Sequence, residues 1–245
     1  ENRYIGLSTH PNILGFCAML GLALIPFLLQ ELPRRFSWVV LLAAASCGYG
    51  IWISGSRAAL LVAGAVMVLY PLLARSIGAA LVLFGLGIVP VFLVGRTLSS
   101  GEVGNNIIGR LAGGGSATAS DQAREALAAT TLDRFLAHPL FGVGFGEVLE
   151  AHNIYLQVAA AGGVAVLLFY IVLLLSVLRQ PFAIGSSYRL LALPAMAYAL
   201  IGPITPLLWD RYIWCALAIP FLVAASGKQE PAESSPHNVM TKENA

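Results

Sequence analysis

The chain has 245 residues, of which 58% are hydrophobic and only 11% are charged, and its mean hydropathy is +0.80. Soluble domains carry about 25% charged residues, so this composition excludes an ordinary soluble protein and indicates a polytopic membrane protein. The formal net charge is +2, and the basic residues are scattered among apolar segments, so nothing indicates a nucleic-acid partner.

Several segments are apolar enough to cross a bilayer, which takes about 20 residues. They are residues 12–30, 36–54, 57–74, 76–94, 153–178, 188–207 and 211–226. The last two contain prolines, which spans tolerate where neighbouring helices satisfy the freed carbonyls. The sequence therefore predicts an all-α polytopic bundle of about 7 transmembrane helices. This membrane domain covers residues 1–226, and a disordered cytoplasmic tail is expected at 227–245.

A long polar connection, residues 95–151, separates the fourth and fifth predicted spans. Within it, apolar residues recur at helical spacing and predict an amphipathic helix that ends near Ala137. The stripe consists of Ala123, Leu127, Thr131 and Phe135, with Leu132 and Leu136 beside it. A connection of this length is more often functional than a simple linker.

Arginines in short loops give the expected orientation, because short loops with an excess of Arg and Lys stay on the cytoplasmic side of the membrane. The short loops on one side hold Arg34, Arg35, Arg75 and Arg179. We therefore expect that side to be cytoplasmic. The connection 95–151 and the Ser54–Arg57 turn then face outward.

Glycines at alternate positions, Gly142, Gly144 and Gly146, follow the predicted helix of the connection. Such a series suits a regular helix poorly, so we interpret it as a tight, close-packed turn. His152 follows at the mouth of an apolar span. An ionisable side chain at a membrane boundary is a candidate functional residue.

Three sequence motifs are similar to signatures of the bacterial O-antigen ligase and O-antigen polymerase family. The first is Ser54-Gly55-Ser56-Arg57, at the start of a predicted span. The second is Arg124 with Pro139-Leu140-Phe141-Gly142-Val143-Gly144, fifteen residues later. The third is His152-Asn153-Ile154-Tyr155-Leu156, with Gly162-Gly163 further along. Together the resemblance covers roughly residues 4–225.

The chain departs from the family pattern in two respects. Family members often carry a tryptophan four residues after the loop arginine, and this chain has Ala128 there. It also has fewer predicted spans than the family's usual ten or more, and it begins with Glu1. We therefore expect it to be a C-terminal portion of a longer membrane protein.

The resemblance implies a multi-pass glycosyltransferase of the bacterial inner membrane with its active site facing the periplasm. Its donor would be a glycan on undecaprenyl diphosphate. Its acceptor would be lipid A-core in a ligase or another lipid-linked glycan in a polymerase; the residues do not separate these, and we favour the ligase. The family is thought to work without a metal and with inversion. We accordingly expect membrane lipid as a partner, but no cofactor, metal or nucleic acid.

The side chains suit this chemistry. Without a metal, the charge on a departing diphosphate needs fixed cations, and arginine binds phosphate oxygens in pairs and stays charged. We assign that role to Arg57 and Arg124. A neutral His152 would accept the proton of the acceptor hydroxyl. Three further residues are assigned to substrate binding: Asn153, Asp210 and Arg211.

Each assignment has a structural alternative. Arg57 could lie at the membrane interface with its stem in lipid, Arg124 could be a solvated helix residue, and His152 could simply begin a helix. Asp210 and Arg211 could pair within an aromatic belt. For the whole chain, the alternative is a multi-span transporter of a small solute, which broken spans would also suit. The predicted spans, however, place ionisable residues at their ends and not near the midplane. A structural subunit would leave the outward arginines unexplained.

Overall fold

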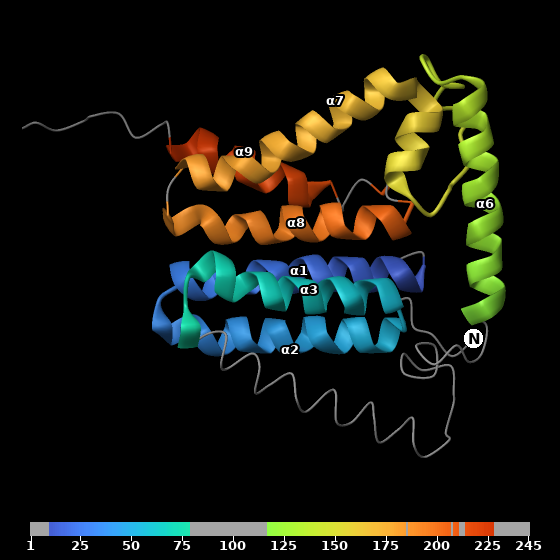
Figure 1. Cartoon of the computed structure of the whole chain (residues 1–245). Helices are drawn as coiled ribbons and strands as arrows, with labels where there is room; N and C mark the ends of the chain where they lie inside the picture. The colour runs from blue at the N-terminus through green and yellow to red at the C-terminus, as the bar shows by residue number, and fades with distance from the viewer. Residues whose placement is uncertain (1–9, 79–116, 185, 207, 211–213, 228–245) are drawn as a thin grey trace, which may run out of the picture.

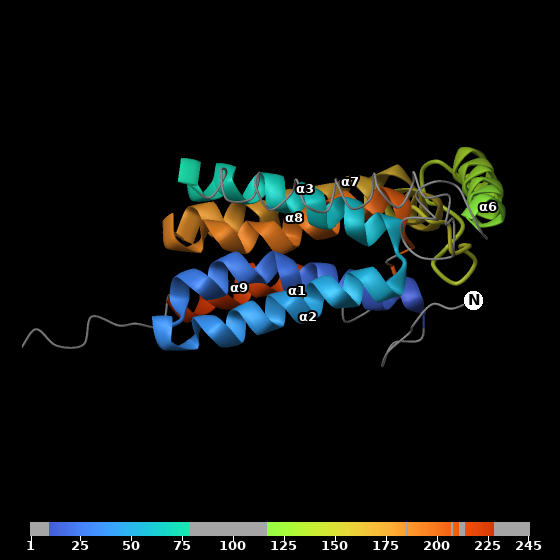
Figure 2. The same ribbon diagram turned by 90° about the horizontal axis from the view of Figure 1, so that it is seen from below.

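The computed structural model describes residues 10–78, 117–184, 186–206, 208–210 and 214–227. Within these ranges every regular element is a helix, as predicted. The long helices run side by side, and one further helix lies across one end of the bundle (Figures 1 and 2). The predicted span 76–94 beyond residue 78, the connection before residue 117, and the predicted tail beyond residue 227 lie outside the described residues.

Helices α1 (Pro11–Glu31) and α2 (Ser37–Ser54) form a hairpin. His10 caps α1, because its Nδ1 accepts a hydrogen bond of 3.1 Å from the backbone N–H of Asn12. Pro11 suits the first helical position, where its missing N–H removes no helical hydrogen bond. The short 3-10 helix η1 (Arg34–Phe36) then leads the chain back into α2.

A tight turn joins α2 to α3 (Arg57–Ala74). Gly55 has φ 61° and ends α2 in the left-handed conformation that glycine adopts without strain. Ser56 caps α3, since its Oγ accepts a hydrogen bond of 3.3 Å from Ala59 N–H. Helix α1 packs closely on the turn, because a Cβ added to Gly15 would lie 2.7 Å from Ser54 Oγ. The start of α3 is therefore fixed against α1.

Helix α6 (Ala117–Ala137) confirms that the long connection carries a helix, and it lies across the end of the bundle (Figure 1). The predicted apolar stripe is only partly covered. Thr131 is buried and Leu127 and Phe135 are half-buried, whereas Leu132 and Leu136 are 44% and 63% exposed.

Helix α7 (Ile154–Ile184) is broken at Gly163, where φ is 72° and ψ is −173°. Its first part runs across the end of the bundle beside α6, and its second part turns to follow the other long helices (Figure 1). The predicted span 153–178 therefore forms two helical parts that run in different directions, one before and one after Gly163.

The core is centred on α8 (Ala192–Ile201), which packs against α1, α3, α7 and α9 (Cys215–Gly227). Leu193, Tyr198 and Ile201 of α8 are fully buried. The Tyr198 hydroxyl is hydrogen-bonded to that of Tyr170 on α7 at 3.0 Å. Such a bond satisfies both hydroxyls in the apolar interior.

Within the described part, four helices are long and apolar enough to cross a membrane. They are Pro11–Glu31, Arg34–Ser54, Arg57–Ala74 and Ile154–Ala183, which match four of the predicted spans. The predicted span 188–207 is shorter than expected, as an apolar segment Tyr188–Ile204 that overlaps the 3-10 helix η2 (Ser186–Leu191) and includes η3 (Gly202–Ile204). Pro203 lies in η3 and Pro206 follows it, and neither residue has an N–H group to donate to a helical hydrogen bond. The predicted span 211–226 is described only as the 13-residue α9.

Candidate functional site

A cavity of about 390 Å³ is built by segments that are far apart in the sequence. The start of α1, the turn before α3, α6, the segment before α7 and the segment after η3 all contribute to its wall. Its titratable or charged side chains are His10, Arg57, Arg124, Glu150, His152 and Asp210. The cavity therefore brings together four of the six predicted site residues. Of the other two, Asn153 does not line it, and Arg211 lies outside the described residues.

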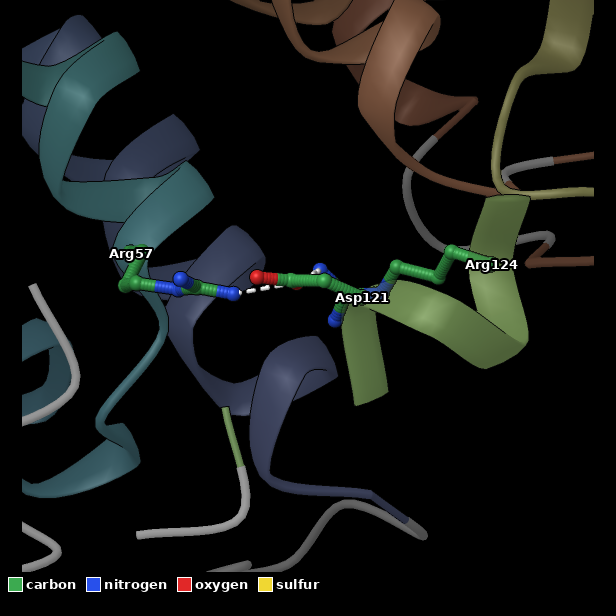
Figure 3. A network of polar contacts seen from close by, with 3 residues as sticks. All are labelled: Arg57, Asp121 and Arg124. Carbon is green, nitrogen blue, oxygen red and sulfur yellow. Dashed lines mark hydrogen bonds and ion pairs between the residues drawn. The ribbon is translucent and has the colours of Figure 1, made fainter. Parts of the chain in front are cut away.

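Arg57 is the first residue of α3, directly after the capping Ser56. The free N–H groups of a helix start lie at this position, and an anion is favoured there. The side chain is 21% exposed, and its Nη2 donates to Asp121 Oδ1 at 2.5 Å (Figure 3).

Arg124 reaches the same carboxylate from α6. Its Nη1 lies 3.5 Å from Asp121 Oδ1, and its side chain is 29% exposed. One carboxylate oxygen thus contacts two guanidinium groups that come from α3 and α6 (Figure 3). Asp121 was not among the predicted site residues. The spacing of Asp121 and Arg124 on a helix is a signal for their pairing, but the contact with Arg57, 64 residues away, depends on the fold.

His152 lies at the cavity wall, two residues before α7, and is half-buried. Burial lowers the pKa of its imidazole from the ordinary 6.5, and the charges of Arg124 and His10 lower it further. The ring is therefore neutral at pH 7 and able to accept a proton. Its buried Nδ1 makes no hydrogen bond to any residue that the structure describes.

The segment before His152 is held by α7. Gln157 is fully buried, and its Nε2 donates to the carbonyl of Leu149 at 3.1 Å. Asn153 caps α7, because its Oδ1 accepts a hydrogen bond of 3.1 Å from Leu156 N–H. The structure thus gives Asn153 a clear structural role, and its substrate-binding role stays a prediction.

Thr205 is a wall residue that sequence analysis missed. It follows η3 in extended conformation, with φ −149° and ψ 141°, and is only 3% exposed. Its buried Oγ1 makes no hydrogen bond within the described part of the chain. A buried hydroxyl without a partner is costly, so this atom is a candidate for binding a ligand.

The glycine series forms the predicted tight turn, residues 138–146, which we call the glycine turn. Gly142 and Gly144 have positive φ values of 67° and 93°, whereas Gly146 is not among the glycines with positive φ. The turn packs its backbone on the break in α7. Its hydrogen bonds run from Val143 N–H to Ala160 O at 2.8 Å and from Gly144 N–H to Ala161 O at 2.9 Å.

The break in α7 completes this contact, since Val164 N–H donates to Pro139 O at 2.8 Å. Side chains would not fit between the two backbones. A Cβ on Gly142 would lie 2.3 Å from Ala161 O, and one on Gly163 would lie 2.1 Å from Leu140 O. The glycine turn therefore joins the end of α6 to α7. Helix α6 carries Arg124 nearer its start, and α7 begins beside His152.

Among the residues that the structure describes, no group of three or more His, Cys, Asp or Glu side chains could hold a metal ion. The positive charge of the cavity wall comes from its arginines.

Comparison with known proteins gave one family. The family model described as O-antigen ligase matches residues 42–171, which is more than half of the chain. The matched range contains Arg57, Arg124, His152 and the glycine turn. Neither a curated protein nor a solved structure matched the chain. The extent of the family match places this chain in the O-antigen ligase family.

Proposed function

We propose that this protein is a membrane glycosyltransferase that moves a glycan from undecaprenyl diphosphate to lipid A-core at the periplasmic face of the inner membrane. One observation carries the proposal. Arg57, Arg124 and His152, from three separate segments, line one cavity at the end of an apolar helix bundle. A lipid-linked donor requires this combination, because its polyprenyl chain needs an apolar surface and its diphosphate needs a cationic site at the edge of that surface.

In the proposed reaction, an acceptor hydroxyl oxygen attacks the anomeric carbon as the bond from that carbon to the diphosphate oxygen breaks. The hydroxyl proton passes to His152. Arg57 and Arg124 bind the departing diphosphate oxygens, whose negative charge grows in the transition state. A single displacement of this kind inverts the anomeric carbon. Removing one such charge-stabilising donor typically costs about 10²–10³ in rate.

The pKa of His152 fits the role of base. Because burial and the neighbouring Arg124 and His10 lower it, the imidazole is unprotonated at pH 7 and available to the acceptor. Thr205 Oγ1 and His152 Nδ1 are both buried and lack hydrogen-bond partners within the described residues. Hydroxyl groups of a glycan or of the acceptor sugar would supply such partners.

A transporter is less well supported. Transporters place ionisable residues near the bilayer midplane. Among the described residues, the buried polar side chains are Ser54, Ser56, Thr131, Gln157 and Thr205, and no Asp, Glu, Lys, Arg or His is among them.

A polymerase would use the same donor site with a different acceptor, so the proposed reaction step applies to a polymerase unchanged.

The test is glycan transfer in cells that express the full-length protein in place of their own ligase. The variants are Arg57→Ala and His152→Ala, and the readout is the lipopolysaccharide ladder on a gel. Matched controls are Arg34→Ala, at an exposed arginine of η1, and His138→Ala, at an exposed histidine after α6. Immunoblots verify equal protein levels.

Loss of the ladder in both site variants, with both controls intact, is the expected result. Accumulation of lipid-linked polymer in the site variants identifies a ligase, whereas accumulation of single lipid-linked repeats identifies a polymerase. A normal ladder in both site variants contradicts the proposed function.

A further inference from the structure

Asp121 occupies the space between the two arginines of the proposed diphosphate site. It lies near the start of α6, and its Oδ1 is 2.5 Å from Arg57 Nη2 and 3.5 Å from Arg124 Nη1 (Figure 3). Figure 3 shows the three side chains pointing toward one another, with the carboxylate in the middle. The mechanism above gives this residue no task.

A carboxylate and a phosphate bind to a guanidinium group through the same fork of N–H donors. The Asp121 carboxylate therefore uses donors that a diphosphate would need. Charge gives the same conclusion. Arg57 and Arg124 carry two positive charges, which match the two negative charges of a diphosphate diester. With Asp121 in place, half of that positive charge is cancelled.

We propose that Asp121 is a positioning residue. In the empty enzyme its carboxylate occupies the position of the donor's diphosphate, and it is displaced when a polyprenyl diphosphate binds. The inference rests on the proposed function, because it takes Arg57 and Arg124 as the diphosphate site. In the empty enzyme, the carboxylate keeps both guanidinium groups directed at one point. Its 49% exposed side chain is able to turn into water when the donor arrives.

This exchange also keeps α6 in place. Arg57 belongs to α3 and Asp121 to α6, so their ion pair joins the start of α6 to the bundle. When the donor enters, its diphosphate bridges Arg57 and Arg124 and so replaces the ion pair as the link between the two helices. Donor affinity is consequently lowered by competition with Asp121, while the geometry of the bound state is unaffected.

The effect of removing this competition is modest, because partly exposed ion pairs change equilibria by no more than about fivefold. Asp121→Asn keeps the shape of the side chain and removes its charge. We expect the Kd for farnesyl diphosphate, a short polyprenyl diphosphate, to fall about two- to fivefold. The measurement uses the full-length protein in nanodiscs of neutral lipid. The matched control is Glu125→Gln, which makes the same charge change at an exposed residue of the same helix and should leave the Kd unchanged.

Two further measurements separate competition from an indirect effect. In glycan transfer, the KM for donor should fall with the Kd while kcat stays within about twofold. In an Arg57→Ala background, Asp121→Asn should have a smaller effect, because the competed interaction is already gone. An unchanged or higher Kd for Asp121→Asn, or equal tightening by Glu125→Gln, would overturn the proposal.

The source of the phosphate group is tested in the same assay. Inorganic diphosphate should displace farnesyl diphosphate from wild type and from Asp121→Asn, and at least as effectively from the variant, because Asp121 competes with both ligands. If Asp121→Asn binds phosphatidylglycerol more tightly than wild type does, but does not bind farnesyl diphosphate more tightly, the site serves a lipid headgroup and the assignment to the donor fails. If Arg57→Ala and Arg124→Ala bind farnesyl diphosphate as well as wild type does, the proposed function itself fails. If the two arginine variants bind farnesyl diphosphate more weakly than wild type, but Asp121→Asn does not bind it more tightly, only the role of Asp121 is rejected.

Discussion

The substitution Gly163→Ala tests whether the glycine turn positions the site. Gly163 has φ 72° and ψ −173°, a conformation that costs a residue with a side chain roughly 1–3 kcal/mol. The added Cβ would also lie 2.1 Å from Leu140 O and 2.7 Å from Phe141 N. Both are backbone atoms, so the glycine turn must move away as a unit.

Moving the turn breaks its hydrogen bonds to α7, made by the N–H groups of Val143, Gly144 and Val164. Each such bond contributes about 0.5–1.5 kcal/mol, so strain and lost bonds together amount to roughly 2.5–7.5 kcal/mol. A difference of 3 kcal/mol already changes an equilibrium more than about a hundredfold. The partly exposed ion pair of Asp121 contributes only about 0.2–1 kcal/mol and does not hold α6 by itself.

We therefore expect Gly163→Ala to release α6 locally while the bundle, whose core is centred on α8, stays folded. Glycan transfer should fall about a hundredfold, as for loss of one charge-stabilising arginine. Limited proteolysis should show faster cleavage between residues 138 and 152. The control is Gly146→Ala, because a Cβ there would meet nothing within 4 Å. A normal ladder and normal proteolysis in Gly163→Ala would refute the reasoning.

Three other predictions concern single residues of the site. Thr205→Val preserves shape and removes only the unpartnered hydroxyl, so transfer should fall about tenfold without loss of thermal stability; equal activity would exclude a ligand contact. Because burial and neighbouring charges lower the pKa of His152 from 6.5, kcat/KM should be constant around pH 7 and fall only below pH 6.5, as the imidazole gains a proton. Arg124→Gln removes one of those charges, so its residual activity should begin to fall at a higher pH than that of wild type; an identical profile would argue against His152 as the base. Asn153→Ser keeps a capping side chain and should retain near-normal transfer, whereas a large loss would favour the sugar-binding role.

Long apolar runs made the membrane helices predictable. The predicted spans 12–30, 36–54 and 57–74 agree with the observed helices to within a few residues, because about 20 apolar residues in succession are a strong local signal. The span 188–207 was harder to predict, because the extent of a helix next to prolines depends on the neighbouring helices. Local hydrophobicity does not carry that information.

The polar parts of the site divide in the same way. Arg57, Arg124 and His152 stand in sequence motifs and were predicted from them, and the fold brings all three to one cavity wall. Asp121 and Thr205 were missed, because each gains its significance from a partner or a cavity formed by distant segments. The break in α7 was also missed. Gly162-Gly163 marked a special position, but its conformation depends on the close contact with Leu140.

Together these contacts explain how a long connection can hold Arg124 at a defined point of the cavity wall. Helix α6 is attached at its start by the ion pair of Asp121 with Arg57, and at its end by the glycine turn on α7. A helix that is held at both ends has lost its freedom before substrate binds, so this ordering does not oppose donor binding. Small displacements of reacting groups reduce rates by large factors. The attachment at the glycine turn is made by backbone hydrogen bonds, whereas the ion pair lies where the donor's diphosphate is proposed to bind. In the proposed mechanism, the donor completes the site by replacing this ion pair.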